Sequence, residues 1–132
     1  MPAQDEFAVA AARNPDALDG EYAVHLVAPF LPRPLRFFGH TKVFRREGSV
    51  TLGYNRFLGG LIKTGRFYVA RGRAEDGSEV TQILYDLPDN PFFMRPLTDE
   101  VRETAPGRFL GRGIMTIAGR ARRVFWFTVT RA

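Results

Sequence analysis

The chain carries its densest group of ionisable side chains in residues 98–104. In an extended strand, successive side chains point to opposite faces, so Glu100 and Arg102 share one face and Asp99 lies on the other. If this strand belongs to a closed barrel, Glu100 and Arg102 on the inward face would pair with each other or meet a polar ligand group, because an unpaired buried charge is costly. The alternative is a short, solvated strand in which Val101 alone is buried.

Two further side chains are candidates for proton transfer. His40 follows the aromatic stretch 37–39 and belongs to the residue type that titrates near neutral pH. Asp86 follows Tyr85 at the expected end of a strand, where it could act as a general acid or base or anchor a substrate hydroxyl. The structural alternatives are a hydrogen-bonded histidine and an aspartate that caps a turn. The candidate catalytic residues are Asp86, Glu100 and His40.

The composition removes much of the common catalytic chemistry. Cysteine is absent, which excludes disulfides, thiolate zinc sites and cysteine nucleophiles. The chain has two histidines, and its serines are Ser49 and Ser78, so neither a serine triad nor an all-protein zinc site is expected. The sequence also contains no phosphate-binding loop, dinucleotide fingerprint or calcium loop. We expect no cofactor and no metal ion.

Aromatic residues make up 13% of the chain, which favours an apolar binding site. In the run Phe125–Phe127, alternation sends Trp126 to one face and its two neighbours to the other. One face would line the interior, and the other would need cover from the N-terminal segment or from a second copy in a homodimer. The candidate ligand-binding residues are Tyr54, Tyr68, Tyr85, Arg102, Arg112, Met115 and Trp126.

These side chains must be positioned by β-strands, because short apolar or alternating runs between turn residues follow one another from residue 18 to residue 132. Residues 1–17 form an N-terminal arm, in which the alanine-rich stretch 3–13 predicts a short helix that ends before Pro15. Strands are predicted over Tyr22–Val27, Arg36–Arg46, Ser49–Tyr54, Gly65–Arg73, Glu79–Tyr85, Leu97–Thr104, Arg108–Ile117 and Arg122–Arg131.

About eight antiparallel strands in one chain of 132 residues most simply close into an up-and-down β-barrel. A closed barrel leaves no free strand edge, and its interior can hold one small ligand. Gly111 and Gly113 fall within a predicted strand, where glycine permits a sharp bend of the barrel wall. The alternative architecture is a β-sandwich.

The net charge of +5 is carried almost entirely by 17 arginines. Residues 22–74 and 104–132 are basic and residues 1–21 and 75–103 are acidic, so these segments can neutralise one another in the folded domain. A nucleic-acid partner would need a contiguous basic face, which the sequence alone does not establish, and we do not expect one. The arginines that would carry such a face are Arg66, Arg71, Arg73, Arg120, Arg122 and Arg123.

Two stretches resemble the lipocalin-like (calycin-type) small barrels of bacteria. Residues 18–22 resemble the segment that leads into their first strand, with Tyr22 in place of the usual tryptophan, and residues 85–112 resemble a motif set of uncharacterised lipocalin-like domains. The resemblance implies a barrel with an internal pocket and names no ligand. Related haem-binding barrels use a histidine near the C-terminus, whereas the last histidine here is His40, so no haem is implied.

The first functional hypothesis is a barrel that binds a small hydrophobic or amphipathic molecule, with a carboxylate or phenolic group of that molecule meeting an arginine. The second is a cofactor-free isomerase or cyclase that acts on an apolar biosynthetic intermediate in the same cavity. The first residues lack the features of a secretory signal, and no apolar run is long enough to span a membrane, so the default expectation is a cytoplasmic protein.

Overall fold

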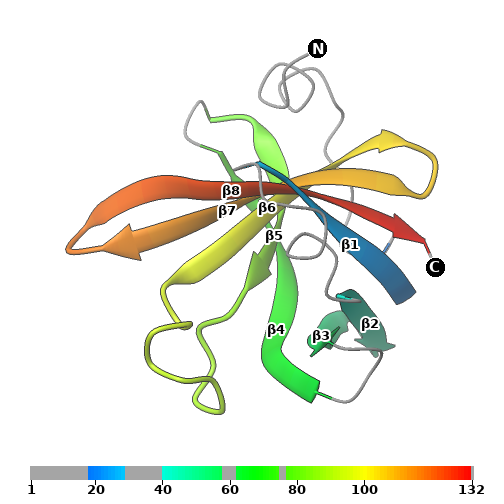
Figure 1. Ribbon diagram of the computed structural model, residues 1–132, viewed down its shortest axis with the longest axis horizontal. Helices are drawn as coiled ribbons and strands as arrows, with labels where there is room; N and C mark the ends of the chain where they lie inside the picture. The colour runs from blue at the N-terminus through cyan, green and yellow to red at the C-terminus, as the bar shows by residue number, and fades with distance from the viewer. Residues whose placement is uncertain (1–17, 29–39, 58–61, 75–76, 132) are drawn as a thin grey trace.

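The computed structural model describes residues 18–28, 40–57, 62–74 and 77–131. These residues form a closed barrel in which each strand pairs with the next in antiparallel fashion and the last pairs with the first (Figure 1). The predicted barrel is confirmed, and closure excludes the sandwich. The strands are β1 (Gly20–Ala28), β2 (Thr41–Glu47), β3 (Val50–Phe57), β4 (Ile62–Arg73), β5 (Glu79–Leu84), β6 (Leu97–Ala105), β7 (Arg108–Ile117) and β8 (Arg120–Arg131).

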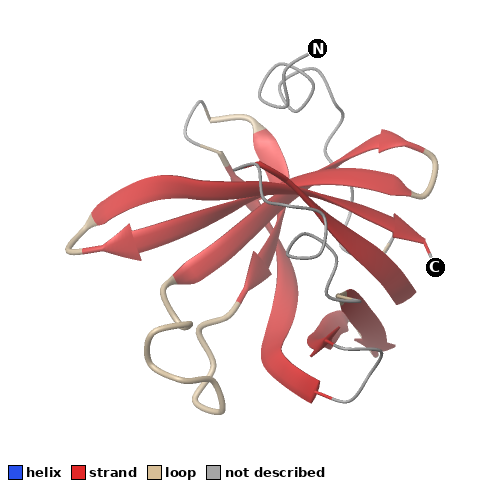
Figure 2. Cartoon of the chain, viewed as in Figure 1, coloured by secondary structure: helices blue, strands red, loops and turns tan. Residues whose placement is uncertain are grey.

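Strands, turns and loops account for the whole described part of the chain, which contains no helix (Figure 2). The helix predicted over residues 3–13 and the first part of the strand predicted from Arg36 lie outside the described residues. No helix that is long and apolar enough to cross a membrane occurs in the described ranges.

Aromatic side chains fill one end of the barrel interior. The ring of Tyr22 meets that of Phe44 at 5.4 Å and that of Phe109 at 6.0 Å, both edge to face. Phe44 in turn lies 5.2 Å from Phe67, and Phe67 lies 5.7 Å from Tyr85. Edge-to-face contacts of this kind stabilise a core beyond the area they bury. Among the described residues, this end of the barrel is therefore a packed core.

The pairing of β3 with β4 is interrupted by a β-bulge. Gly53 pairs with Phe67 and Asn55 pairs with Thr64, so β4 holds one residue more than β3 between these two pairs. Gly65 sits in this bulge with a φ of 62°, a left-handed conformation that glycine adopts without strain. As a result, Thr64 and Phe67 both face inward, and the backbone carbonyl of Gly65 becomes available to a side chain in the interior.

The loop between β5 and β6 is held to the barrel by Asn90. The Nδ2 atom of Asn90 donates to the carbonyl oxygens of Arg66 at 2.7 Å and Tyr85 at 2.6 Å, and its Oδ1 atom accepts from the amide of Arg66 at 3.0 Å. Beyond this attachment, Phe92 and Phe93 are exposed, whereas Met94 turns back towards the core. One buried amide therefore attaches this twelve-residue loop, residues 85–96, to β4.

The Gly53→Ala variant tests how closely the neighbouring strands β2 and β4 approach the backbone of β3 at this position. A Cβ atom on Gly53 would lie 2.1 Å from the carbonyl oxygen of Val43 and 2.5 Å from the Phe67 ring, and the backbone oxygen cannot move aside cheaply. We expect a loss of roughly 1–3 kcal/mol in the free energy of unfolding, measured by urea denaturation. Thr116→Ala, at an exposed strand position, serves as the control and should change stability by about 0.5 kcal/mol or less. Equal stabilities for the two variants would contradict this account.

Candidate functional site

The barrel contains a half-open cavity of about 360 Å³ at the end opposite the aromatic core. Its walls are mostly apolar, with Val24 and Leu26 contributed by β1, Leu97 by β6, and Phe125 and Phe127 by β8. A volume of this size lies in the lower part of the range for small-molecule sites, which are usually apolar with a few fixed polar groups. The polar groups here are gathered in one place.

A buried ion pair forms the polar end of the cavity. The Nζ atom of Lys42 lies 3.4 Å from Oδ2 of Asp99, and both side chains are almost completely buried, with 3% and 2% exposed. Lys42 also donates hydrogen bonds to the hydroxyl of Tyr85 at 2.5 Å and to Oδ1 of Asn55 at 2.8 Å. The ammonium group thus has an acceptor for each of its three N–H bonds, as a buried charge requires.

Tyr85 and Asn55 complete the network around this pair. The Tyr85 hydroxyl donates to Oδ2 of Asp99 at 3.0 Å, and Nδ2 of Asn55 donates to the Gly65 carbonyl oxygen at 2.9 Å. The same Nδ2 lies 3.3 Å from the Tyr85 oxygen. Oδ1 of Asp99 is buried and has no hydrogen-bond partner among the described residues, so it is the one carboxylate oxygen of the site that can still accept a hydrogen bond.

His40 closes the polar end at its edge. Its Nε2 atom donates to Oδ1 of Asn55 at 2.8 Å, and its ring stacks on Phe57 with the ring centroids 4.3 Å apart. Burial, followed by the positive charge of Lys42, lowers the pKa of His40 from 6.5 to about 4, against a smaller opposing effect of the Asn55 hydrogen bond. His40 is therefore a neutral imidazole at neutral pH.

Burial pushes the ion pair towards its uncharged form. It lowers the pKa of Lys42 and raises the pKa of Asp99, while the charge of each partner opposes the shift of the other. Burial and the Asp99 charge together raise the pKa of Tyr85 well above 10.0, so its hydroxyl stays protonated. Both shifts bring the pKa values of Lys42 and Asp99 closer together, and a proton on either residue leaves this end of the cavity without net charge.

Strand geometry explains why these residues meet. On β2, alternation places Lys42 on the same side as the core residue Phe44, and His40 precedes them in the same phase. On β6, Asp99 shares the inward side with Val101, a member of the core. Because β2 and β6 are four strands apart in an eight-stranded barrel, Lys42 and Asp99 come from opposite walls and span the interior.

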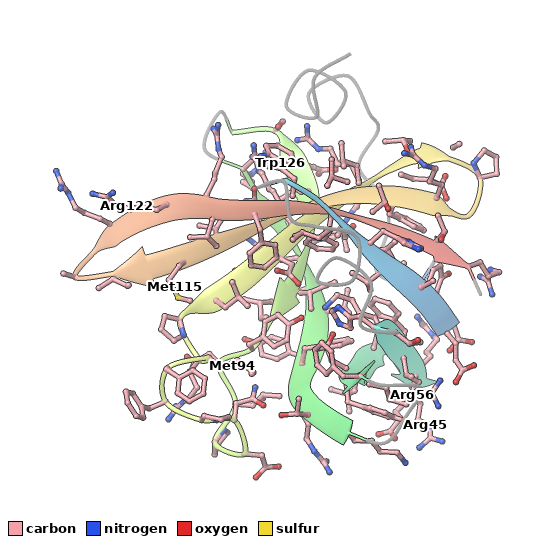
Figure 3. The ribbon with its side chains drawn as sticks, in the orientation of Figure 1. Arg45, Arg56, Met94, Met115, Arg122 and Trp126 are labelled. Carbon is pink, nitrogen blue, oxygen red and sulfur yellow. The ribbon has the colours of Figure 1, made fainter. Side chains whose placement is uncertain are left out.

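Of the residues proposed from the sequence, the structure brings His40 and Tyr85 to this cavity. Trp126 lies on the other face of β8 from Phe125 and Phe127, as alternation predicts, and packs against a second buried cluster formed by Ala74, Val80 and Leu110. In Figure 3, Trp126 lies away from Met94, a residue that lines the cavity.

Glu100, Arg102 and Arg112 face away from the cavity and are nevertheless buried. The Nε atom of Arg112 donates to Oε1 of Glu100 at 2.7 Å, and its guanidinium lies 5.7 Å from the centroid of the Trp126 ring. Glu100 and Arg112 line a polar recess of about 270 Å³ on that side of the sheet. Arg102 donates to the carbonyl oxygen of Glu79 at 3.1 Å. The alternative of a short, solvated strand with Val101 alone buried is therefore wrong for β6, because its neighbours Glu100 and Arg102 are buried as well.

The remaining candidates lie elsewhere. Asp86 is exposed and forms an ion pair with Arg95 at 3.0 Å. The ring of Tyr54 lies under the amine of Lys63 at 5.8 Å, and Tyr68 is half-buried outside the cavity. Met115 pairs with Arg122 along the extended β7–β8 hairpin, at a distance from the cavity residue Met94 (Figure 3). None of these side chains lines the cavity.

Sequence reasoning did not propose Lys42, Asn55 or Asp99 for the site. A usable signal was present for Lys42 and Asp99, because Lys42 alternates in phase with Phe44 and Asp99 alternates in phase with Val101. A charged residue in phase with a core residue must either end the strand or be buried with a partner. Within the described ranges, no three His, Asp or Glu side chains are grouped so that they could hold a metal ion.

No protein-family model, curated protein or solved structure matches this chain. The functional argument therefore rests on the geometry and chemistry of the cavity.

The pKa of His40 predicts a specific pH dependence of stability. Between pH 6.5 and about 4 the unfolded chain binds a proton at this residue and the folded chain does not, so the contribution of His40 to stability falls as the pH is lowered. The raised pKa of Asp99 acts with the opposite sign, since its contribution falls as the pH rises. The effect of His40 is therefore measured as the difference in the free energy of unfolding between the wild type and a variant that lacks this histidine.

We expect the wild type to lose up to roughly 3 kcal/mol relative to a His40→Gln variant between pH 6.5 and 4, because the glutamine cannot titrate. Urea denaturation of both proteins at several pH values measures this difference. Parallel stability curves for the two proteins would contradict the assignment of His40 as a buried, neutral imidazole.

Proposed function

We propose that the protein binds a small, neutral and mainly apolar molecule inside the barrel. The observation that carries this proposal is the cavity of about 360 Å³ with apolar walls and one polar end. A barrel whose interior was needed only for stability would be packed throughout, as the aromatic end is. The cavity end instead leaves room beside six polar side chains, namely His40, Lys42, Asn55, Thr64, Tyr85 and Asp99.

The charges at the polar end indicate the kind of molecule that fits. Lys42 and Asp99 neutralise each other, and His40 carries no charge at neutral pH. No arginine is among the described residues that line the cavity, so the sequence-based idea of a ligand carboxylate held by an arginine finds no support in that part of the chain. A carboxylate ligand would bring an unpaired charge into an apolar cavity, whereas a hydroxyl or carbonyl group would find hydrogen-bond partners.

The closed barrel of eight antiparallel strands is compatible with the lipocalin-like plan, whose members hold small apolar ligands in the same place. We propose this relationship on the architecture and on the resemblance of residues 18–22 and 85–112. Because one fold serves many functions, the relationship supports the site and does not by itself identify the ligand.

The alternative function is a cofactor-free isomerase or cyclase. The observation that favours it is Oδ1 of Asp99, a buried carboxylate oxygen without a hydrogen-bond partner, in a residue that lines the cavity. Burial raises the pKa of Asp99, which makes the carboxylate a stronger base than an exposed aspartate. Asp99 would remove a proton from an apolar substrate, and the Tyr85 hydroxyl would stabilise the developing oxyanion.

A pair of neighbouring variants on β1 tests ligand binding. Leu26 lines the cavity, whereas Val27 is 42% exposed on the other side of the strand. We expect the neutral fluorophore N-phenyl-1-naphthylamine to bind the wild type, and Leu26→Trp to weaken its binding by about tenfold or more because the indole occupies the cavity. Val27→Trp is the matched control and should bind like the wild type. Equal binding by the two variants would place the fluorophore outside the barrel, against the proposal.

The acid–base alternative has its own probe, 5-nitrobenzisoxazole, which opens when a base removes its ring proton. We expect saturable ring opening by the wild type, measured from the absorbance of the phenolate product. In Asp99→Asn we expect the rate to fall by roughly tenfold or more. Asp86→Asn distinguishes the buried carboxylate from the exposed one. Loss of rate in Asp86→Asn and not in Asp99→Asn would rule out the cavity as the reactive site.

A further inference from the structure

The amine of Lys42 forms part of the cavity wall, and so does each of its three polar partners, Asn55, Tyr85 and Asp99. The chain has only one other lysine, Lys63, which is exposed with its amine 5.8 Å from the centroid of the Tyr54 ring. A primary amine facing an apolar cavity is the group that condenses with aldehydes and ketones.

We infer that the cavity takes a neutral aldehyde or ketone and holds it covalently, as an imine on Nζ of Lys42. This inference rests on the proposed function and specifies its ligand class. The carbonyl group of an aldehyde or ketone is neutral and polar, so it fits the uncharged end of the cavity, and it condenses with the amine found there.

The network supplies a route for the proton that must leave the amine first. The distances from Nζ of Lys42 to the Tyr85 oxygen and from that oxygen to Oδ2 of Asp99 are 2.5 and 3.0 Å, so Tyr85 can accept a proton from Lys42 while it passes its own to Asp99. Burial lowers the pKa of Lys42 and raises that of Asp99, and both shifts favour this transfer. The result is an uncharged amine beside a neutral carboxylic acid.

The reaction then balances without any further reagent. The nitrogen lone pair attacks the carbonyl carbon, the carbonyl oxygen becomes a hydroxyl as a proton moves from nitrogen to oxygen, and a carbinolamine results. The proton held by Asp99 returns through Tyr85 to that hydroxyl, which leaves as water while the C=N bond forms. The net change is one carbonyl compound and one ammonium group converted into one iminium group and one water molecule.

The surroundings suit the iminium product as well as the amine. Its positive charge stays close to the Asp99 carboxylate, which has regained its negative charge. The nitrogen also lies 5.3 Å from the ring centroids of Phe67 and Tyr85 and 5.7 Å from that of Phe127. Aromatic faces at these distances attract a cation, so the charge created by the reaction replaces that of the ammonium without a new desolvation cost.

Reductive trapping tests the imine. The wild type is incubated at neutral pH with cinnamaldehyde and sodium cyanoborohydride, and the labelled lysines are mapped by digestion and mass spectrometry. We expect a single adduct with the mass of the aldehyde less one oxygen atom, formed on Lys42 roughly tenfold faster than on Lys63. Tyr85→Phe should slow labelling of Lys42 and leave labelling of Lys63 unchanged, because it interrupts the proton route.

The lysine variants provide the matched controls. Lys63→Arg should label like the wild type, and Lys42→Met should lose the fast adduct. If Lys42→Met fails to fold, Lys42→Arg keeps the charge and removes the primary amine, while mapping on the wild type needs no variant at all. Labelling of Lys42 no faster than Lys63 would overturn the inference, as would fast labelling that persists in Leu26→Trp, where the cavity is filled.

Cinnamyl alcohol separates this inference from the proposed function, since it has the same skeleton without the carbonyl group. Displacement of N-phenyl-1-naphthylamine by the alcohol, together with no fast adduct from the aldehyde, would leave a non-covalent binding protein and overturn the imine alone. If neither the fluorophore nor the alcohol binds and no fast adduct forms, the proposed function fails and the imine fails with it.

Discussion

The ion pair between Lys42 and Asp99 is the interaction on which the interior of this barrel depends. The two residues come from opposite walls, and their contact lies between the packed aromatic end and the open cavity. Taking two charges out of water costs several kcal/mol for each ion, and their attraction offsets this only when hydrogen bonds satisfy the remaining donors and acceptors. Tyr85 and Asn55 provide those bonds, so three strands, β2, β3 and β6, and the residue after β5 cooperate to hold one pair of charges.

The rest of the site follows from the need to satisfy that pair. Asn55 bonds to two donors at once. The bulge at Gly65 presents a carbonyl oxygen to its Nδ2 atom, which leaves Oδ1 to accept from both Lys42 and His40. His40 is held neutral by burial and then by the charge of the ammonium group, against the opposing effect of its hydrogen bond to Asn55 on its pKa. The bulge in β4, which positions Asn55, thus acts on the protonation of His40 by raising its pKa.

The sequence allowed the barrel and its strands to be predicted because the alternation of apolar residues is local. The same alternation separated Trp126 from Phe125 and Phe127 correctly, since all three stand in one regular strand. The site was harder to predict because it is non-local: alternation divides β6 into two faces but does not say which one is inward. The inward face of β6 is the one that carries the core residue Val101 and, in phase with it, Asp99. The prediction was based on Glu100 and Arg102, which lie on the outward face. The contact of Lys42 with Asp99 joins residues 57 positions apart and has no signature in either strand.

The attachment of the β5–β6 loop through Asn90 separates the sequence of the loop tip from the shape of the cavity. Asn90 holds the start of the loop, and the amide of Thr116 donates to the carbonyl oxygen of Pro96 at 3.3 Å at its end. Between these attachments Met94 reaches the cavity, whereas Phe92 and Phe93 project into solvent. The loop tip can therefore change its sequence without altering the shape of the cavity. For protein engineering, this makes the tip a place to attach a recognition element to a binding barrel, and for evolution it makes surface association and ligand choice independently adjustable.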